Sequence, residues 1–447
     1  MTKLSKGVKN RELDSRLIVR SPRHTTQGMP TSQRPSYLKV LSNRPFFSLW
    51  FGQLVSVSGD AIFDVALLWL VLTTTGSIFL VGITQAVIFL PTVIVAPIAG
   101  VYVDRFNRQT TMVVSNVVQG GVVAAISFLY FIDELPFPVL LALIFVLYSF
   151  SRFFYAATKA TIPRLVQDHD NLTAANSLFS LTTSFNQFAS YAVGGLIIAL
   201  LGVDLPITYD SITFFFAAAM FMLIPKHLGE MPVHPDSVQL SPSRRSFRAD
   251  FTEGLRYFLS SRLLVELAIL AAVVNLSLGG VFALLAPYAK FWVNGDSSTY
   301  GFILAAFSLG LFLGAYVVGK LRNTREYVGK LQFAGVFAVG TIIAFVGLST
   351  TQFLAIALIF TFGFVLSVLN VPLQALFQAI IPQEVFGRVI TVIVALLSIA
   401  QPLSAAVSGY AATVFSIGEV FIAFGFLAIL VSVVGYLTLR ELRLAKY

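Results

Sequence analysis

Two aspartates in a long apolar segment are the side chains with the clearest capacity for chemistry in this sequence. Asp60 and Asp64 lie four residues apart, and Gln53 and Ser56 extend the same face of a helix with 3.6 residues per turn. An ionised group at the centre of a bilayer costs roughly 2.5–3.5 kcal/mol on insertion scales, so this face is expected to meet a cavity or a partner. Two neighbouring carboxylates in a medium of low dielectric constant can hold a proton near neutral pH. We therefore predict proton coupling by Asp60 or Asp64; the alternative is a structural hydrogen bond to a neighbouring helix.

Four further charged residues fall inside apolar segments. We place Arg152 near one end of its helix, either as a counter-charge to an aspartate or with its guanidinium extended to the membrane interface. Asp210 lies near the start of its helix, where it caps the helix or joins the proton-coupling cavity. Glu266 and Lys290 lie near opposite ends of one segment, so we expect both to be exposed at the interfaces.

Uncharged polar side chains form stripes on other segments. Such stripes either line a substrate cavity or bond helix to helix, which is their commoner use in membranes. The candidates for the cavity are Gln53, Ser56, Gln187, Tyr191, Asn370, Gln374 and Gln401.

A short loop between two apolar segments carries a compact group of charges. It contains Gly100, Asp104, Arg105 and Arg108. Glycine lets neighbouring helices approach closely, and an acid at a helix end can pair with a nearby arginine. The loop therefore predicts a gate at the face of the membrane where it lies; the alternative is a basic loop with one incidental acid.

The elements that must position these residues are about twelve membrane-spanning helices. All 30 Lys and Arg except Arg152 and Lys290 fall in the tails and in every second gap between apolar runs. Excess Lys and Arg mark the cytoplasmic side, so the alternation predicts twelve crossings with both termini cytoplasmic. The helices are expected at about 46–72, 78–101, 111–132, 138–157, 174–201, 207–225, 263–291, 299–319, 331–349, 353–377, 389–414 and 420–439.

Composition agrees with a multi-pass protein of the cell membrane. The 447 residues are 57% hydrophobic and 11% charged, with a mean hydropathy of +0.83, whereas soluble domains carry about 25% charged residues. The net charge of +9 is spread over many short loops, which favours anionic lipid headgroups over nucleic acid as the partner. Cysteine is absent and the four His show no metal-ligand spacing, so we expect no metal and no cofactor.

Five regions follow from this reading. Residues 1–45 are a basic tail expected to be disordered, 46–225 a first six-helix bundle, 226–260 a Pro- and Arg-rich cytoplasmic linker, 261–439 a second six-helix bundle, and 440–447 a short cytoplasmic tail. The two bundles show a weak internal repeat, because Gly100-Val-Tyr-Val resembles Gly314-Ala-Tyr-Val and Ile162-Pro163 resembles Ile381-Pro382. Chance matches among Gly and Pro remain the alternative, but such repeats are typical of transporters.

The loop sequence Gly100-Val-Tyr-Val-Asp104-Arg105-Phe-Asn-Arg108 resembles the G-x-x-x-D-R-x-x-R signature of the major facilitator superfamily. Residues 47–77, 153–178 and the start of the sixth segment at Tyr209-Asp210 are similar to its macrolide- and multidrug-efflux branch. The resemblance implies two pseudo-symmetric six-helix bundles, alternating access and export driven by protons. Two positions depart from the pattern: Val318 replaces the acid in the second copy of the loop, and Ser190-Tyr191 lacks the Gly-Pro pair of many antiporters.

We therefore expect an all-α membrane protein, a monomer and not an enzyme, that exports an amphipathic small molecule in exchange for protons. Asp60 and Asp64 would carry the proton and Arg152 would tune them. One alternative with the same fold is an importer or facilitator of a nutrient or siderophore. Two alternatives from other classes are a polytopic membrane enzyme and the membrane half of a nucleotide-driven pump.

Overall fold

The computed structural model describes residues 37–103, 105–166, 168–229, 247–320 and 327–445. Within these ranges the chain forms helices and no strand. Eleven helices are long and apolar enough to cross a membrane, and the bent pair α3 and α4 gives a twelfth. The prediction of an all-α protein with twelve spanning helices is therefore confirmed.

The first six spans cover the N-terminal part of the chain. They are α2 (Arg44–Thr75), α3 with α4 (Ile78–Ile94 and Ala96–Val103), α5 (Arg108–Phe131), α6 (Phe137–Leu165), α7 (His169–Leu201) and α8 (Asp204–Met222). Short helices precede and follow them, α1 (Tyr37–Leu41) and α9 (Lys226–Gly229). Within this N-terminal half, α2 packs against α7 and α8, and α5 packs against α6 and α8.

The last six spans repeat this arrangement. They are α11 (Arg262–Pro287, continued by a π-helical turn over Tyr288–Trp292), α12 (Ser297–Lys320), α13 (Val328–Leu348), α14 (Gln352–Ile380), α15 with α16 (Gln383–Ser398 and Ala400–Val414) and α17 (Ile417–Thr438). Two further helices lie outside the spans, α10 (Phe247–Ser260) and α18 (Arg440–Leu444). Helix α10 lies within the region 226–260 that was predicted to be the linker.

Proline explains both interrupted spans. Its ring clashes with the carbonyl group four residues earlier and removes one helical hydrogen bond. Pro97 follows the end of α3 at Ile94 by three residues, and α3 and α4 meet at 42°. Pro402 lies four residues after Ser398, where α15 ends. Each half therefore contains one jointed span, and the two joints belong to helices that face each other.

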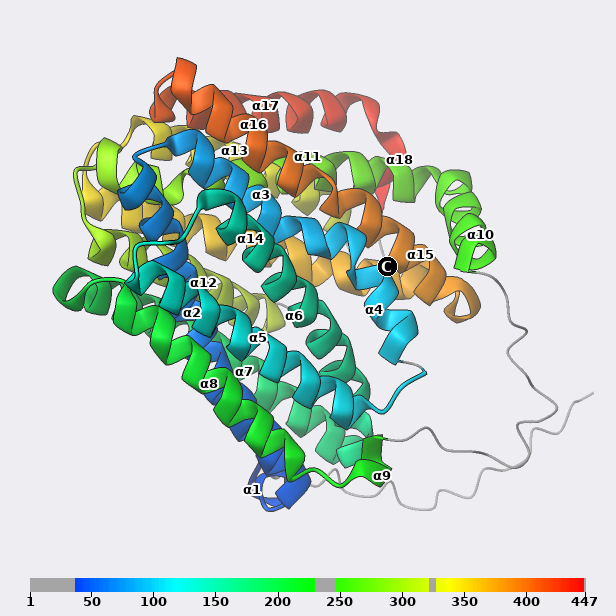
Figure 1. Cartoon of the computed structure of the whole chain (residues 1–447). Coiled ribbons are helices and arrows are strands. Elements are labelled where there is room, and N and C mark those ends of the chain that lie inside the picture. The colour runs from blue at the N-terminus through cyan, green and yellow to red at the C-terminus, as the bar shows by residue number, and fades with distance from the viewer. Residues whose placement is uncertain (1–36, 104, 167, 230–246, 321–326, 446–447) are drawn as a thin grey trace, which may run out of the picture.

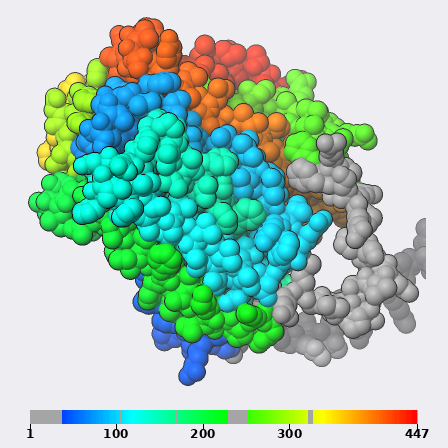
Figure 2. Space-filling view, viewed as in Figure 1, coloured from blue at the N-terminus to red at the C-terminus, as the bar shows by residue number. Residues whose placement is uncertain are grey.

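The two halves meet through two equivalent helix pairs (Figure 1). The second span of the N-terminal half, α3, packs on the fifth span of the C-terminal half, α16, and α7 packs on α12 in the same way. Glycine permits both contacts: a Cβ atom at Gly82 would lie 2.6 Å from the Cα of Gly409, and one at Gly195 would lie 2.8 Å from the Cα of Gly301. The space-filling view shows α3 and α16 abutting along the line between the halves (Figure 2).

We call the end of the bundle where α2 begins and α6 ends the basic end, because Arg44, Arg164, Arg262 and Lys320 lie there. The glycine contacts lie toward the opposite end, near the start of α3 and of α12. Toward the basic end the helices of the two halves spread apart (Figure 1).

Candidate functional site

Asp64 lies at the centre of a small hydrogen-bonded group within the bundle. The hydroxyl of Tyr148 on α6 donates to Asp64 Oδ1 at 2.5 Å, and the hydroxyl of Tyr191 on α7 donates to Asp64 Oδ2 at 3.4 Å. Gln187, one helical turn before Tyr191, donates from Nε2 to the Tyr191 hydroxyl at 3.0 Å. Three helices of the N-terminal half thus fix one half-buried carboxylate.

This carboxylate faces a cavity of about 230 Å³ that both halves build. The N-terminal half contributes its acid and two tyrosines, and the C-terminal half contributes uncharged side chains only. The lining residues are Asp64, Leu68, Gln85, Ile88, Phe89, Tyr148, Tyr191, Leu278, Phe282, Tyr300, Leu304 and Gln401. A lone carboxylate among aromatic rings and amides can bind a proton or a cationic group, because little else there compensates its charge.

Asp60 lies one helical turn from Asp64, toward the basic end, and is half-buried. Asp60, Asp64 and Arg152 are close enough to interact electrostatically. In the described part of the chain Arg152 forms no direct ion pair with either aspartate; its Nη2 donates to the Ser151 hydroxyl at 3.5 Å. The positive charge therefore acts on the carboxylates over a longer range.

Arg152 lies in the middle of its helix rather than near an end. The sequence placed the end of this helix at about residue 157, but α6 continues to Leu165. Helical hydrogen bonding continues past the last strongly apolar residues into a turn that carries Lys159 and Arg164. Arg152 is consequently an intramembrane cation at the level of the aspartates.

Asp210 is fully buried between α8 and α2 and does not cap its helix. The helix begins earlier than expected, at Asp204, so Asp210 lies in its second turn. Its Oδ1 accepts a hydrogen bond from the Thr213 hydroxyl at 3.3 Å, whereas its Oδ2 has no hydrogen-bond partner among the described residues. Gly59 makes room for this group, because a Cβ there would lie 2.5 Å from Asp210 Oδ1.

The predicted cavity residues divide into three groups: those at the site, those buried on α2, and those exposed on α14. Gln187 and Tyr191 join the Asp64 group, and Gln401 lines the cavity while donating to Asn275 Oδ1 at 2.9 Å. Ser56 is buried on α2, and the buried Gln53 Oε1 has no described partner. Asn370 and Gln374 are exposed on α14 and do not line the cavity around Asp64.

The predicted gate residues lie at the basic end, where α4 leads into α5. Gly100 and Arg105 are exposed. Arg108 is buried and donates from Nη1 to the carbonyl oxygen of Ala160 at 3.2 Å, which joins α5 to α6. Asp104 lies outside the described residues, so the pairing expected of it stays a prediction.

Three polar residues that line the cavity were not among the predicted ones, namely Tyr148, Gln85 and Tyr300. Gln85 was detectable, since it is an amide in the middle of an apolar segment. The two tyrosines carry no such signal, because tyrosine is common in apolar helices and the partner of its hydroxyl lies on another helix.

Two interlocked helical halves around a cavity with an intramembrane carboxylate define a membrane transporter. The sequence model of the family described as transmembrane secretion effector, within the major facilitator superfamily, matches residues 36–445. The chain belongs to this family, and the resemblance seen in the loop motif is confirmed. It is a multi-pass membrane protein of a family that moves small molecules across the bilayer.

Several relatives are themselves exporters by name. The chain is 24% identical over 392 residues to macrolide efflux protein A of Streptococcus pyogenes, covering 87% of this chain and 94% of the relative. It is 29% identical over 276 residues to the putative bacilysin exporter BacE of Bacillus subtilis, covering 61% and 65%. The MFS-type transporter YvqJ of Bacillus subtilis is 24% identical over 403 residues, covering 90% and 94%.

Solved structures share the fold at low identity. The nucleoside transporter NupG superposes with a TM-score of 0.70 at 9% identity, covering 89% of this chain and 99% of that one. A POT family transporter bound to a thioalcohol-conjugated peptide superposes with a TM-score of 0.69 at 13% identity, covering 89% and 96%. The prediction of two six-helix bundles of the major facilitator fold is thereby confirmed.

Proposed function

We propose that the protein is a secondary active transporter that exports an amphipathic small molecule from the cell in exchange for protons. The observation that carries this proposal is the position of Asp64. Its carboxylate is held by Tyr148 and Tyr191 of one half, yet faces a cavity that the other half closes. A change in the angle between the halves therefore changes the surroundings of this acid.

That geometry supports an exchange mechanism. When the cavity opens to acidic water, Asp64 takes up a proton and loses its attraction for a polar or cationic substrate group. When the cavity opens to the other side, the proton leaves and the carboxylate is available again. Asp60, Arg152 and Asp210 are near enough to interact electrostatically with the aspartate pair and would tune the local charge that Asp64 experiences.

The distribution of Lys and Arg supports an orientation with the basic end in the cytoplasm. The gate would then consist of Gly100, Asp104, Arg105 and Arg108 on the cytoplasmic face. Arg108 already ties α5 to α6 there. Both termini would lie in the cytoplasm, and the complete site within one chain supports a monomer as the working unit.

The chemistry of the cavity supports an amphipathic substrate. Phe89 and Phe282 present apolar rings, whereas Gln85, Gln401 and Asp64 present polar groups. The names of the relatives support export, because one is a macrolide efflux protein and another a putative bacilysin exporter. In the described part of the chain, no group of His, Cys, Asp and Glu is placed to hold a metal ion.

The decisive experiment measures uptake of a macrolide into everted membrane vesicles with an imposed pH gradient, acidic inside. We expect uptake by the wild type and none by Asp60→Asn/Asp64→Asn at equal protein levels. Asp204→Asn is the matched control, because Asp204 is exposed at the start of α8. Proton-driven uptake by the double variant at the wild-type rate would refute the coupling.

Right-side-out vesicles from the same cells separate export from import. The neighbouring folds include a nucleoside transporter and a peptide transporter, so the fold does not fix the direction. If the inverse gradient in right-side-out vesicles drives uptake, the protein is an importer. Transport that needs ATP and resists dissipation of the pH gradient would instead indicate a nucleotide-driven pump.

A further inference from the structure

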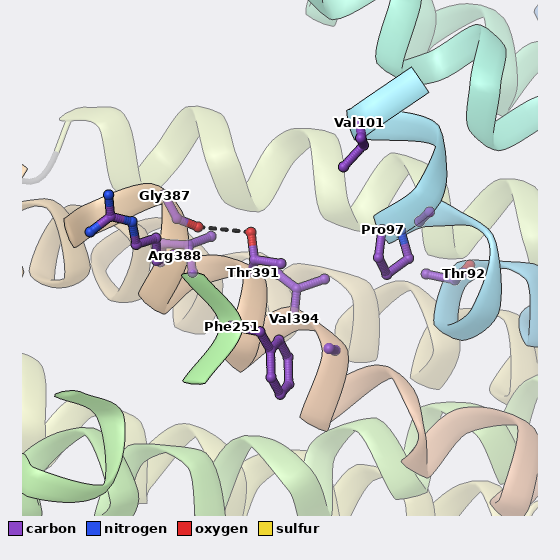
Figure 3. A pocket seen from close by; sticks show the side chains of 12 residues that line it. Thr92, Pro97, Val101, Phe251, Gly387, Arg388, Thr391 and Val394 are labelled. Carbon is purple, nitrogen blue, oxygen red and sulfur yellow. Dashed lines mark hydrogen bonds between the residues drawn. The ribbon is translucent and has the colours of Figure 1, made fainter. Parts of the chain in front are cut away.

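A second cavity opens between the two halves toward the basic end, apart from the one around Asp64. It has a volume of about 420 Å³ and lies between α3 and α4 on one side and α15 on the other (Figure 3). Pro97 and Val101 face Val394 across it, and Phe251 of the linker helix α10 forms one side. The Thr391 hydroxyl donates to the Gly387 carbonyl oxygen at 2.8 Å, so the wall presents mainly carbon. We call this cavity the linker cleft.

The linker cleft and the Asp64 cavity lie along the same pair of helix faces. On the N-terminal half, Gln85 and Phe89 line the Asp64 cavity and Thr92 and Ala96 line the cleft. The spacing of three or four residues places Gln85, Phe89 and Thr92 on one face of α3, and Ala96 follows at the start of α4. The C-terminal half repeats this order, because Thr391 and Val394 line the cleft, and Gln401, two turns further, lines the Asp64 cavity. The linker cleft and the Asp64 cavity therefore follow one another along these helices, with the cleft nearer the basic end.

The linker helix α10 is firmly attached to α15, on the C-terminal side of the cleft. Glu253 of α10 forms an ion pair with Arg388 of α15 at 2.9 Å. Gly254 lies directly on the backbone of α15, since a Cβ there would come 2.6 Å from the Arg388 carbonyl oxygen. Phe258 of α10 packs in one apolar cluster with Val389. Phe251 is consequently held in the cleft by the C-terminal half rather than carried loosely by the linker.

The linker cleft differs from the α3–α16 contact at the opposite end of the bundle in how closely its glycines approach the other half. Gly82 and Gly409 touch, whereas Gly100 and Gly387 have no heavy atom within 4 Å of a Cβ position. Both of these glycines line the cleft from opposing halves. The two glycine faces thus leave open space in the cleft in this conformation.

We propose that the linker cleft is a loading site, in which the apolar part of the substrate binds before its polar group reaches Asp64. The ligand class is an amphipathic molecule with an extended apolar tail, which Phe251, Val101 and Val394 contact. This inference rests on the proposed transport function. Its position between the two halves, lined by the same helices as the Asp64 cavity, distinguishes it from a lipid groove on the outer surface.

The test uses alkyltriphenylphosphonium cations with methyl and decyl tails as probes in everted vesicles. Val394→Trp fills the cleft, and Leu396→Trp on the exposed side of α15 is the matched control. We expect Val394→Trp to raise the KM for the decyl probe about tenfold, equivalent to losing the burial of roughly two methylene groups. The KM for the methyl probe should change less than about threefold, as expected if its short tail buries little apolar surface. Phe251→Ala should produce the same selectivity more weakly.

A binding measurement keeps this inference separate from transport. The chain contains no cysteine, so Val394→Cys accepts a single polarity-sensitive fluorophore, and Leu396→Cys provides the control. The decyl probe should shift the emission at position 394 only, with or without a pH gradient. Equal responses at both positions, or no response at 394, would overturn the loading site. If the emission at 394 shifts but the wild type transports neither probe, the loading site stands and the proposed transport function fails for these compounds.

Discussion

The two halves of the molecule share one architecture but distribute their charges differently. Around the central cavity the N-terminal half carries Asp60, Asp64 and Arg152, and Asp210 is buried nearby. The C-terminal half faces the same cavity with Gln401, Tyr300 and apolar residues only. An intramembrane charge is costly, so the restriction of the charges around this cavity to one half suggests that the halves have separate tasks. We infer that the first half handles protons and the second shapes the substrate surface.

The C-terminal half does contain a buried acid, Glu266, but its surroundings are different. Glu266 Oε1 accepts from Arg262 Nε at 3.0 Å, and Oε2 accepts from the backbone N–H of Leu442 at 2.7 Å. Both carboxylate oxygens are therefore occupied by donors at the basic end. Asp210 leaves one oxygen without a described partner. A satisfied acid anchors structure, whereas an incompletely satisfied one can accept a proton.

The division of tasks between the halves is tested most directly by substituting one cavity residue in each half. Asp64→Asn should reduce gradient-driven transport to the level of vesicles without the protein, because an amide cannot release a proton in this pH range. Gln401→Leu should leave proton coupling intact and raise the KM for substrate. Both are measured as initial uptake rates against imposed pH gradients. If Gln401→Leu abolishes coupling as Asp64→Asn does, the division of tasks is wrong.

The next largest effect concerns the anchor in the C-terminal half. Glu266→Gln should destabilise the protein by about 1–3 kcal/mol, because a neutral amide oxygen replaces the charged acceptor of the buried Leu442 N–H and the amide NH2 group turns toward Arg262. Thermal unfolding of purified protein measures this loss. Removal of residues 440–447 should make the same substitution much less harmful, since α18 then no longer needs the carboxylate. If the losses of stability from the substitution and the truncation simply add in the combined variant, Glu266 does not anchor α18.

Much of the fold was accessible from the sequence because hydrocarbon imposes a length on every span. The helices lie close to the apolar runs, and the basic gaps lie at one end. The predicted helix ends were less accurate where helical hydrogen bonding continues into charged residues. Arg152 was therefore placed near the end of its helix, although it lies in the middle. The regions proposed for the two tails and the linker lie partly outside the described residues, in 1–36, 230–246 and 446–447, so these assignments stay predictions.

The site was less accessible because it depends on contacts between distant segments. Asp60 and Asp64 could be selected by the cost of their burial alone. Tyr148 could not be selected from the sequence, since its hydroxyl reaches Asp64 only when α6 lies beside α2. Glu266 was expected at an exposed interface, but it is 3% exposed. The chain folds back over it at Leu442, and no local pattern around Glu266 indicates such a contact.

A smaller effect tests how Asp64 is held. Tyr148→Phe removes one hydrogen bond of about 1 kcal/mol and should slow transport about fivefold. The fold should persist, because the ring remains in place. Tyr155→Phe is the control, since Tyr155 is exposed on the same helix. Equal rates for both variants, measured under one pH gradient, would show that the Tyr148 hydroxyl does not position Asp64.

The smallest expected effect separates the two partners of Glu266. The Arg262 side chain is 71% exposed, so its ion pair with Glu266 is screened by water. Exposed pairs contribute about 0–1 kcal/mol, and Arg262→Gln should therefore shift thermal unfolding far less than Glu266→Gln. A large shift would mean that the carboxylate depends on its counter-charge rather than on the backbone N–H of Leu442. In that case Glu266 would resemble Asp64 with its remote Arg152, and the contrast between a structural acid and a functional acid would weaken.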